Sequence, residues 1–174
     1  DWGTLARFHV LDDGQYRDAR ACPPAGRGGS TTVNVADCPD LLRADRTILG
    51  SAQERWLEDG LAQRDVRWNL VAQQTLMAPF TWTKEGRYWT DGWAGYPAAR
   101  DRLLDAIVAR NVSNPVVLSG DVHCNYVCDI KRRVDRLKST AAWRGPGDAI
   151  PLQESVGPRD AIGRGSINVL LDDY

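Results

Sequence analysis

A short apolar run that stops at a glycine is the feature that most restricts how this chain can fold. The run is Pro115-Val116-Val117-Leu118-Ser119, and Gly120-Asp121-Val122-His123 follows it directly. A run of this length between Pro and Gly predicts a buried strand. In open α/β sheets the carboxyl ends of the strands carry the ligand chemistry, so Asp121 and His123 are expected at such an edge.

Asp121 and His123 together offer part of a metal coordination shell. A carboxylate oxygen suits a hard cation, and a neutral imidazole nitrogen suits a borderline transition metal. The alternative is structural: Asp121 caps the following turn, and His123 makes a local hydrogen bond. Two ligands do not complete a site, and the spacing alone leaves both interpretations open.

The composition describes a chain that can bury a core in one domain. It has 174 residues, 43% of them hydrophobic, and seven tryptophans. A formal charge of −1 and a pI near 6.1 give no general attraction to nucleic acid or to anionic membranes. The basic run Lys131-Arg132-Arg133 is interpreted as a solvated turn. No stretch is long and apolar enough to span a bilayer.

The start of the sequence carries no recognisable targeting signal. Asp1-Trp2-Gly3-Thr4 lacks a charged region followed by an apolar one. The single methionine is Met77. We therefore expect a mature product, an excised domain or a fragment.

The four cysteines form two pairs with different interpretations. Cys22 and Cys38 flank a loop rich in Pro, Gly, Ser and Thr that cannot pack by itself, so a disulfide is the favoured prediction. A zinc site is the weaker alternative, because no C-x-x-C or second nearby histidine accompanies them. Cys124 lies beside His123 and is either a thiolate ligand or a small buried residue; its pairing with Cys128 stays open.

One-sided apolar patterns predict two helices. Ser51 and Glu54 fit a capping box, so a helix is expected to begin at Ser51 and to end between Gly60 and Arg64. Its predicted apolar face holds Ala52, Trp56 and Leu57. A second helix is predicted from Pro97 to Asn111, with an apolar face made of Leu103, Leu104, Ile107 and Val108.

Strands are expected at residues 5–11, 66–73 and 115–119, which alternate with these helices. This order is typical of an α/β layered domain. Beyond residue 131 the pattern weakens: residues 139–165 are expected to form a loop or to be partly disordered, and residues 167–171 to form a terminal strand. The predicted division is a domain at residues 1–130 and a loop-rich tail at residues 131–174.

An aromatic segment from Phe80 to Tyr96 shows neither helical nor strand periodicity. It contains Trp82, Trp89 and Trp93 among its rings. Such a long loop is a functional wall or lid, or its rings bury against a sheet edge.

Ordered matches along the chain resemble the C-terminal half of PhoD-type alkaline phosphatases, within the calcineurin-like metallophosphoesterases. The matching segments are Val10 to Arg17, Leu49 to Leu57, Trp68 to Met77, Asp91 to Arg100, and Gly120-Asp121-Val122-His123. The resemblance implies part of a layered α/β/β/α sandwich and hydrolysis of a small phosphate ester outside the cytoplasm, in a secreted or periplasmic protein. It also implies iron and calcium as cofactors, with Asp121 and His123 as metal ligands.

The chain also departs from that family. The family's N-terminal half, which supplies most of the metal ligands, is absent, so the isolated chain is expected to bind metal weakly and to turn over little substrate. Asp13-Gly14 replaces a Thr-Arg pair, and Ala94 stands where the family has Asp. His9, inside the first strand, is interpreted as a structural histidine.

Four further residues are candidates for the site. Arg17 can bind phosphate with its guanidinium fork, and Tyr16 can donate a phenolic hydrogen bond. Asn125 can support a ligand or a phosphate oxygen, although a turn role is the commoner one. Asp12 is a candidate metal ligand or a turn cap.

Two other functions compete with the phosphatase. One is a secreted, disulfide-stapled binding module whose aromatic loop stacks on carbohydrate or another flat ligand. The other is an inactive fragment, whose exposed sheet edges would favour association.

Overall fold

The computed structural model describes residues 1–26, 29–78, 87–121, 127–128, 130 and 167–170. Its main sheet has the strand order β1-β3-β5-β7-β6. The strands are β1 (Ala6–Val10), β3 (Trp68–Ala72), β5 (Pro115–Ser119), β6 (Val127–Cys128) and β7 (Ile167–Leu170). The first four in spatial order are parallel, and β6 runs antiparallel to β7. The predicted strands are confirmed, and the terminal strand lies inside the sheet, between β5 and β6.

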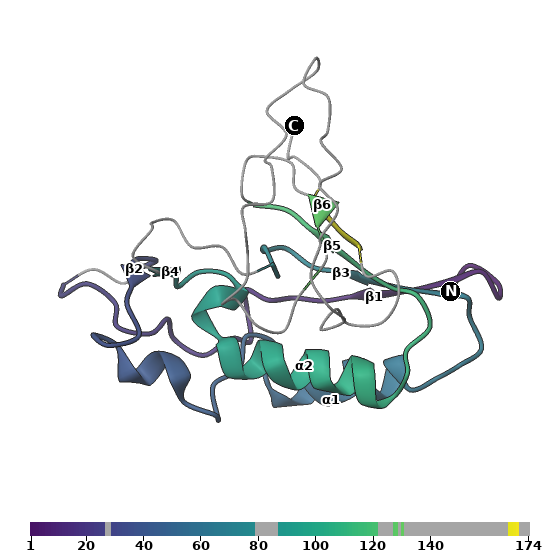
Figure 1. The fold of residues 1–174 in the computed structure, drawn as a ribbon, viewed down its shortest axis with the longest axis horizontal. Helices are drawn as coiled ribbons and strands as arrows, with labels where there is room; N and C mark the ends of the chain where they lie inside the picture. Colours follow the sequence, from purple (N-terminus) through teal and green to yellow (C-terminus); the bar gives the residue numbers. More distant parts are fainter. Residues whose placement is uncertain (27–28, 79–86, 122–126, 129, 131–166, 171–174) are drawn as a thin grey trace, which may run out of the picture.

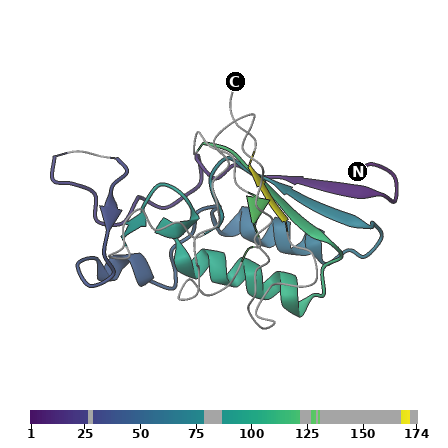
Figure 2. The same cartoon turned by 45° about the horizontal axis from the view of Figure 1, so that its top comes forward.

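The two helices, α1 (Ser51–Leu61) and α2 (Pro97–Ala109), lie side by side on the same face of this sheet (Figure 1). The view in Figure 2 separates the helical layer from the strands. Between the layers lies one core of buried apolar side chains, which includes Leu57, Val71, Leu104, Ile107 and Val117. The predicted α/β class is confirmed.

The start of α1 differs in detail from the predicted capping box. The helix begins at Ser51 as expected, but its N-cap is Gly50, at φ 74°, with no side-chain capping bond. The hydroxyl of Thr47 instead accepts hydrogen bonds from the N–H groups of Leu49 and Gly50 and donates to Glu54. Glu54 therefore accepts a hydrogen bond from Thr47, which precedes the helix, and not from Ser51.

The end of α2 follows from Asn111. This residue has φ 48°, the left-handed conformation that ends many helices. The N–H of Asn111 donates to Val108, and that of Val112 donates to Ile107, at 3.0 and 3.1 Å. These two bonds satisfy carbonyls that the helix itself leaves free.

The predicted apolar faces of the helices are correct in part. Leu57 in α1 and Leu103, Leu104 and Ile107 in α2 are buried. Trp56 and Val108 are 53% and 58% exposed, and Ala52 is also exposed. Each helix contacts the sheet through a narrower stripe than the sequence suggested.

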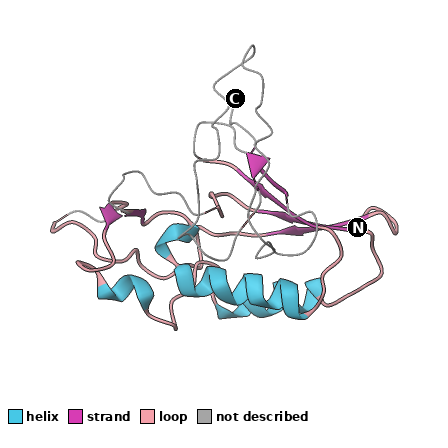
Figure 3. Ribbon diagram, viewed as in Figure 1, coloured by secondary structure: helices cyan, strands magenta, loops and turns pink. Residues whose placement is uncertain are grey.

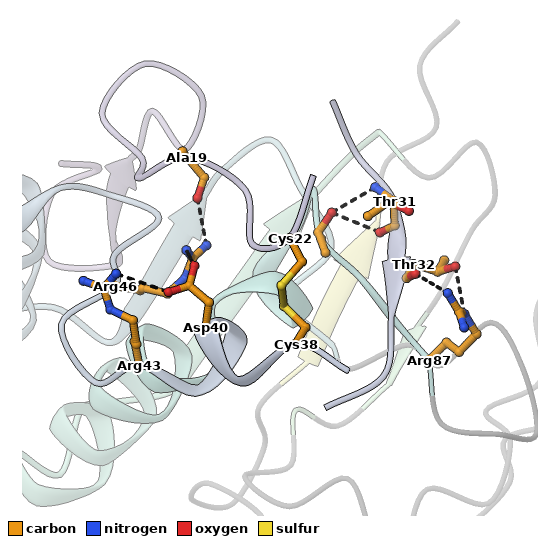
Figure 4. Close-up of a disulfide and its surroundings, with 10 residues drawn as sticks. Ala19, Cys22, Thr31, Thr32, Cys38, Asp40, Arg43, Arg46 and Arg87 are labelled. Atoms are coloured by element: carbon orange, nitrogen blue, oxygen red, sulfur yellow. Dashed lines mark hydrogen bonds and ion pairs between the residues drawn. A yellow bond between two sulfur atoms is a disulfide. The ribbon is translucent and has the colours of Figure 1, made fainter. Parts of the chain in front are cut away.

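A smaller lobe lies beyond the helical layer, at the opposite end of the molecule from the N-terminus (Figure 3). It contains β2 (Thr32–Val33) paired antiparallel with β4 (Tyr88–Trp89), and the 3-10 turn η1 (Pro39–Leu42). The predicted disulfide joins Cys22 to Cys38, with 6.0 Å between their Cα atoms. Figure 4 shows it between Arg46 on one side and the Thr31–Thr32 strand on the other.

In the described part of the aromatic segment, the rings favour burial in the protein rather than an exposed surface that stacks on a ligand. Trp93 begins the 3-10 turn η2 (Trp93–Gly95), and both Trp93 and Tyr96 are essentially buried, at 1% and 0% exposed. Trp93 is therefore unable to offer its ring to a sugar in this conformation. Phe80 and Trp82 lie outside the described residues.

Several other expectations also lie outside the described residues. They concern Cys124, the basic run at residues 131–133 and the interval 139–165. The boundary predicted at residue 130 stays a prediction. Within the described part of the chain, no helix combines the length and apolarity that a membrane crossing requires.

Candidate functional site

A cleft lies where β1, β3 and β5 end. Because the three strands are parallel, the segments that follow them meet at one edge of the sheet. The cleft has a volume of about 560 Å³. Its lining comes from all three strand ends and from the segment before η2: Asp13, Gly14, Arg17, Ala72, Gln73, Gln74, Thr75, Asp91, Leu118, Ser119, Gly120 and Asp121.

Asp121 lies on the rim of this cleft, exposed, at the end of β5. Its φ of 72° places it in the left-handed region, which Asp tolerates better than most residues. The preceding Gly120 donates its N–H to the carbonyl of Gln74, 3.1 Å away. This bond fixes the end of β5 against the segment that follows β3, so Asp121 has a defined place on the rim.

Arg17 is the positive group of the described lining, and Asp91 holds it. The Nη1 of Arg17 lies 2.7 Å from both the backbone carbonyl and Oδ1 of Asp91. The same Oδ1 accepts hydrogen bonds from Nε and Nη2 of Arg20, at 2.8 and 2.6 Å. One carboxylate oxygen therefore orients two guanidinium groups.

Asp13 is buried within the cleft wall. Its Oδ2 accepts hydrogen bonds from the N–H and hydroxyl of Thr75, while its own N–H donates to the side chain of Gln74. Burial raises the pKa of Asp13, and the Thr75 bonds oppose that shift. Asp13 thus links the segment after β1 to the segment after β3.

Gln73 links the next pair of segments. Its Nε2 donates to the hydroxyl of Ser119 and to the carbonyl of Thr75, and its Oε1 accepts the indole N–H of Trp93 at 2.9 Å. This one side chain joins β3, β5 and η2. The buried polar side chains of Asp13 and Gln73 in the cleft wall are therefore hydrogen-bonded to neighbouring protein segments.

Comparison with known proteins identifies the fold. A family model described as PhoD-like phosphatase matches residues 1–147. The chain belongs to the PhoD-like phosphatase family. It is 36% identical over 140 residues to alkaline phosphatase D of Bacillus subtilis (strain 168), an alignment that covers 79% of this chain and 23% of that protein.

A solved structure titled "Structure of PhoD" matches with a TM-score of 0.69 and 28% identity. That match covers 99% of this chain and 27% of the solved chain. This PhoD-like chain therefore spans about a quarter of the length of either relative.

Tyr16 was a candidate together with Arg17, but in the described part of the chain only Arg17 lines the cleft. Tyr16 is 58% exposed and does not line the cleft in the described part of the chain. Its Cβ and carbonyl oxygen lie 3.1 Å from the point that a Cβ on Gly50 would occupy. Tyr16 thus covers the start of α1, while Arg17 faces the cleft.

Asp12 takes the turn role that the sequence favoured. Its Oδ1 accepts hydrogen bonds from the N–H groups of Gly14 and Gln15, both at 2.9 Å. Its backbone N–H and carbonyl both bond to the amide of Gln53 in α1. Its assignment as a metal ligand stays a prediction.

The described residues alone do not make a metal centre. Among them, no three or more His, Cys, Asp or Glu side chains come together as a metal site requires. Asp121 is one suitable donor, while Asp12 and Asp13 each use a carboxylate oxygen to accept two N–H or O–H groups. His123 and Asn125 lie outside the described residues. This donor set is too small for a binuclear site.

Among the described residues, His9 is not part of the cleft lining. It is 2% exposed, its Nε2 lies 3.1 Å from Oδ1 of Asn69, and its ring meets Trp56 edge-on at 6.3 Å. Burial lowers its pKa, and the Asn69 bond opposes that shift. The geometry is that of a structural histidine, as predicted.

The sequence did not single out Asp91, Arg20 or Gln73. Asp91 was visible only as part of the Asp91-Gly92-Trp93 match, without a role. Arg20 lies in the segment before Cys22, in no recognised motif. A usable signal was the Gln73-Gln74 pair, which follows an apolar strand directly and lies within the Trp68 to Met77 match.

Proposed function

We propose that the cleft binds the phosphate group of a phosphate ester and that the chain is one portion of a protein that hydrolyses such esters. The observation that carries this proposal is the position of Arg17 and Asp121 around one cleft, in a chain of the PhoD-like phosphatase family. The substrate and the activity belong to the proposal, because the chain spans 23% of its alkaline phosphatase relative.

Arg17 is suited to the binding step. A guanidinium group presents several donors in a plane, which matches two phosphate oxygens. The side chain is 17% exposed, and Asp91 fixes the Nη1 end. A fixed cation loses less conformational freedom on binding than a free one, so preorganisation favours phosphate here.

Iron and calcium are part of the proposal through the family resemblance. The described donors do not form a site by themselves, so we place no reaction step on these ions. Asp121 and His123 would contribute two ligands, and further ligands would have to come from polypeptide beyond this chain. We therefore expect weak metal binding and little turnover from the isolated chain.

A secreted or periplasmic location is also proposed. The Cys22–Cys38 disulfide supports it, because such bonds persist in oxidising compartments and are rare in the cytosol.

The binding step can be tested without metal by NMR titration of the metal-free chain with inorganic phosphate. We expect shifts at Gly14, Gly120 and Asp121, and loss of those shifts in Arg17→Gln. Arg43→Gln is the matched control, because Arg43 is an exposed arginine paired with Asp40 and Asp45. Equal titration of the wild type and Arg17→Gln would contradict the proposal.

The catalytic expectation needs a separate assay. The purified chain with iron and calcium should hydrolyse p-nitrophenyl phosphate barely above background. Rapid hydrolysis that Asp121→Asn or His123→Ala abolishes would show that this chain alone holds a complete centre.

A further inference from the structure

The orientation of Arg17, the cationic side chain of the cleft, depends on a residue from a segment distant in sequence. Asp91 contacts Arg17 through both its carbonyl and its carboxylate, and it also receives Arg20. Arg17 and Arg20 belong to the segment after β1, whereas Asp91 follows β4. The orientation of Arg17 is thus only as well defined as the position of Asp91.

Asp91 is in turn fixed by the strand pair β2 and β4. Directly before it, the N–H of Thr90 donates to the carbonyl of Thr31 at 2.9 Å. The N–H of Thr31 donates back to the hydroxyl of Thr90 at 2.9 Å, and that hydroxyl donates to the Thr31 carbonyl. Arg87, directly before β4, adds bonds to the side chain and the carbonyl of Thr32. Three hydrogen bonds between Thr31 and Thr90 therefore fix the backbone position directly before Asp91.

The strand pair is too small to hold itself together. Each strand has two residues, and an isolated two-stranded hairpin is marginal even when it is longer. Its supporting core is a cluster of four buried residues, Ala21, Val33, Cys38 and Leu41, with Cys22, Val35 and Tyr88 packed against it. Two of these seven residues are the disulfide cysteines.

The disulfide closes the segment that carries β2. It joins Cys22, two residues after Arg20, to Cys38, directly before η1, and Figure 4 shows it beside the segment that carries Thr31 and Thr32. Cross-linking the ends of a loop removes much of the freedom the loop would have when open. The disulfide therefore restricts the conformations of the segment that presents Thr31 to Thr90.

We infer that the Cys22–Cys38 disulfide is a positioning element of the cleft: it holds Asp91 in place and, through Asp91, presents Arg17 to phosphate. The inference rests on the proposed phosphate-binding function. Reduction of the disulfide by an added small-molecule dithiol would remove this positioning. The dithiol's thiolate attacks one sulfur and breaks the S–S bond, and its second thiol then resolves the mixed disulfide. Both cysteines gain a proton and an electron, and the dithiol becomes a disulfide.

The test compares the full chain before and after reduction by a dithiol, with inorganic phosphate as the probe. Loss of one fixed charge-assisted contact corresponds to about a tenfold weaker affinity, so we expect the reduced chain to bind phosphate about tenfold more weakly. Amide hydrogen exchange at Thr31 and Thr90 should accelerate, while that of β3 and β5 should not change. A reduced chain with unchanged affinity and unchanged exchange would overturn the inference.

Asp91→Asn separates positioning from a general loss of structure. This variant keeps the disulfide but weakens the hold on Arg17, so it should lose affinity on its own, and reduction should add little to that loss. Asp45→Asn is the matched control, since Asp45 is 68% exposed and pairs with Arg43 in the same lobe; it should respond to reduction as the wild type does. A full further tenfold loss on reducing Asp91→Asn would show that the disulfide does not act through Asp91.

Failure of the proposed function gives a different result. If the oxidised chain binds no phosphate, the function assigned to the cleft is wrong. The hydrogen exchange of Thr31 and Thr90 then decides the positioning role alone: faster exchange on reduction supports it, and unchanged exchange overturns it.

Discussion

Asp13 accepts two hydrogen bonds from Thr75 on a single carboxylate oxygen, one from the backbone N–H at 2.9 Å and one from the hydroxyl at 2.6 Å. Both residues are buried, at 1% and 7% exposed. The pair connects the end of β1 to the end of β3, in the wall of the cleft. It therefore contributes to the stability of the sheet edge as well as to its shape.

Breaking this pair should destabilise the protein. Asp13→Ala leaves the buried hydroxyl of Thr75 without its acceptor and leaves the N–H of Thr75 only its longer bond to Oε1 of Gln73, at 3.2 Å, which costs about 1–3 kcal/mol. Urea unfolding followed by tryptophan fluorescence measures the loss, and Asp45→Ala, an exposed aspartate, should lie within about 0.5 kcal/mol of wild type. A double-mutant cycle with Thr75→Val should show coupling; additive effects would mean that the two side chains do not interact in solution.

The pH dependence of stability should carry the signature of His9. Burial lowers the folded-state pKa of His9 below its ordinary 6.5, so the unfolded chain binds the proton first. The stability that comes from neutral His9 is complete above pH 6.5 and is lost as the pH falls, by at most about 1.4 kcal/mol per pH unit.

Comparison of three proteins checks the His9 assignment. His9→Gln should flatten the pH dependence of the unfolding free energy between pH 7 and pH 5, relative to wild type. His123→Gln removes the only other histidine and tests whether the slope belongs to His9. If His123→Gln flattens it instead, His9 is not the group responsible.

Gly95 is predicted to tolerate no side chain. A Cβ at this position would lie 2.7 Å from the carbonyl carbon and 2.8 Å from the Cα of Thr90, and backbone atoms cannot swing aside as a side chain can. Gly95→Ala should destabilise by about 1–3 kcal/mol and should disturb the Thr31–Thr90 bonds. Gly14→Ala, whose new Cβ meets only ordinary contacts, should be close to neutral in the same thermal unfolding assay.

The face of the sheet opposite the helices is expected to make the isolated chain associate. A shallow pocket of about 290 Å³ is lined there entirely by Trp2, Leu5, Ala6, Phe8, Trp68 and Leu70. Phe8 and Val10 are 46% and 70% exposed, and parallel sheets normally have both faces covered. The double variant Phe8→Lys and Val10→Lys should shift sedimentation towards monomer, whereas Val108→Lys on α2 should not. Equal association of both variants would exclude this face.

The secondary structure could be predicted largely from local patterns. The strand at residues 115–119 is bounded by Pro and Gly, and the helix from Pro97 has an N-terminal proline and a left-handed asparagine at its end. These signals act within a few residues, so they survive without tertiary information. The capping box failed because Thr47 and Ser51 compete for Glu54, and the choice depends on where the chain enters the helix.

The site could be predicted only in part. Asp121 and Arg17 were expected and do share a cleft, and Asp12 takes the turn role that its place before Gly14 suggested. Tyr16 lies away from the cleft, because neighbouring side chains on an irregular segment point in directions that spacing does not set. Asp91 escaped notice, since its importance comes from pairing with residues more than seventy positions earlier.

The connection between β1 and β3 has a consequence for how the protein is made. These neighbouring parallel strands are separated by residues 11–67, which contain the whole disulfide segment and α1. During synthesis β1 leaves the ribosome before β3 has been made, so the apolar residues of β1 stay unpaired until β3 emerges. Oxidation of Cys22 and Cys38 would shorten the effective length of this loop and so lower the entropy cost of bringing β1 and β3 together.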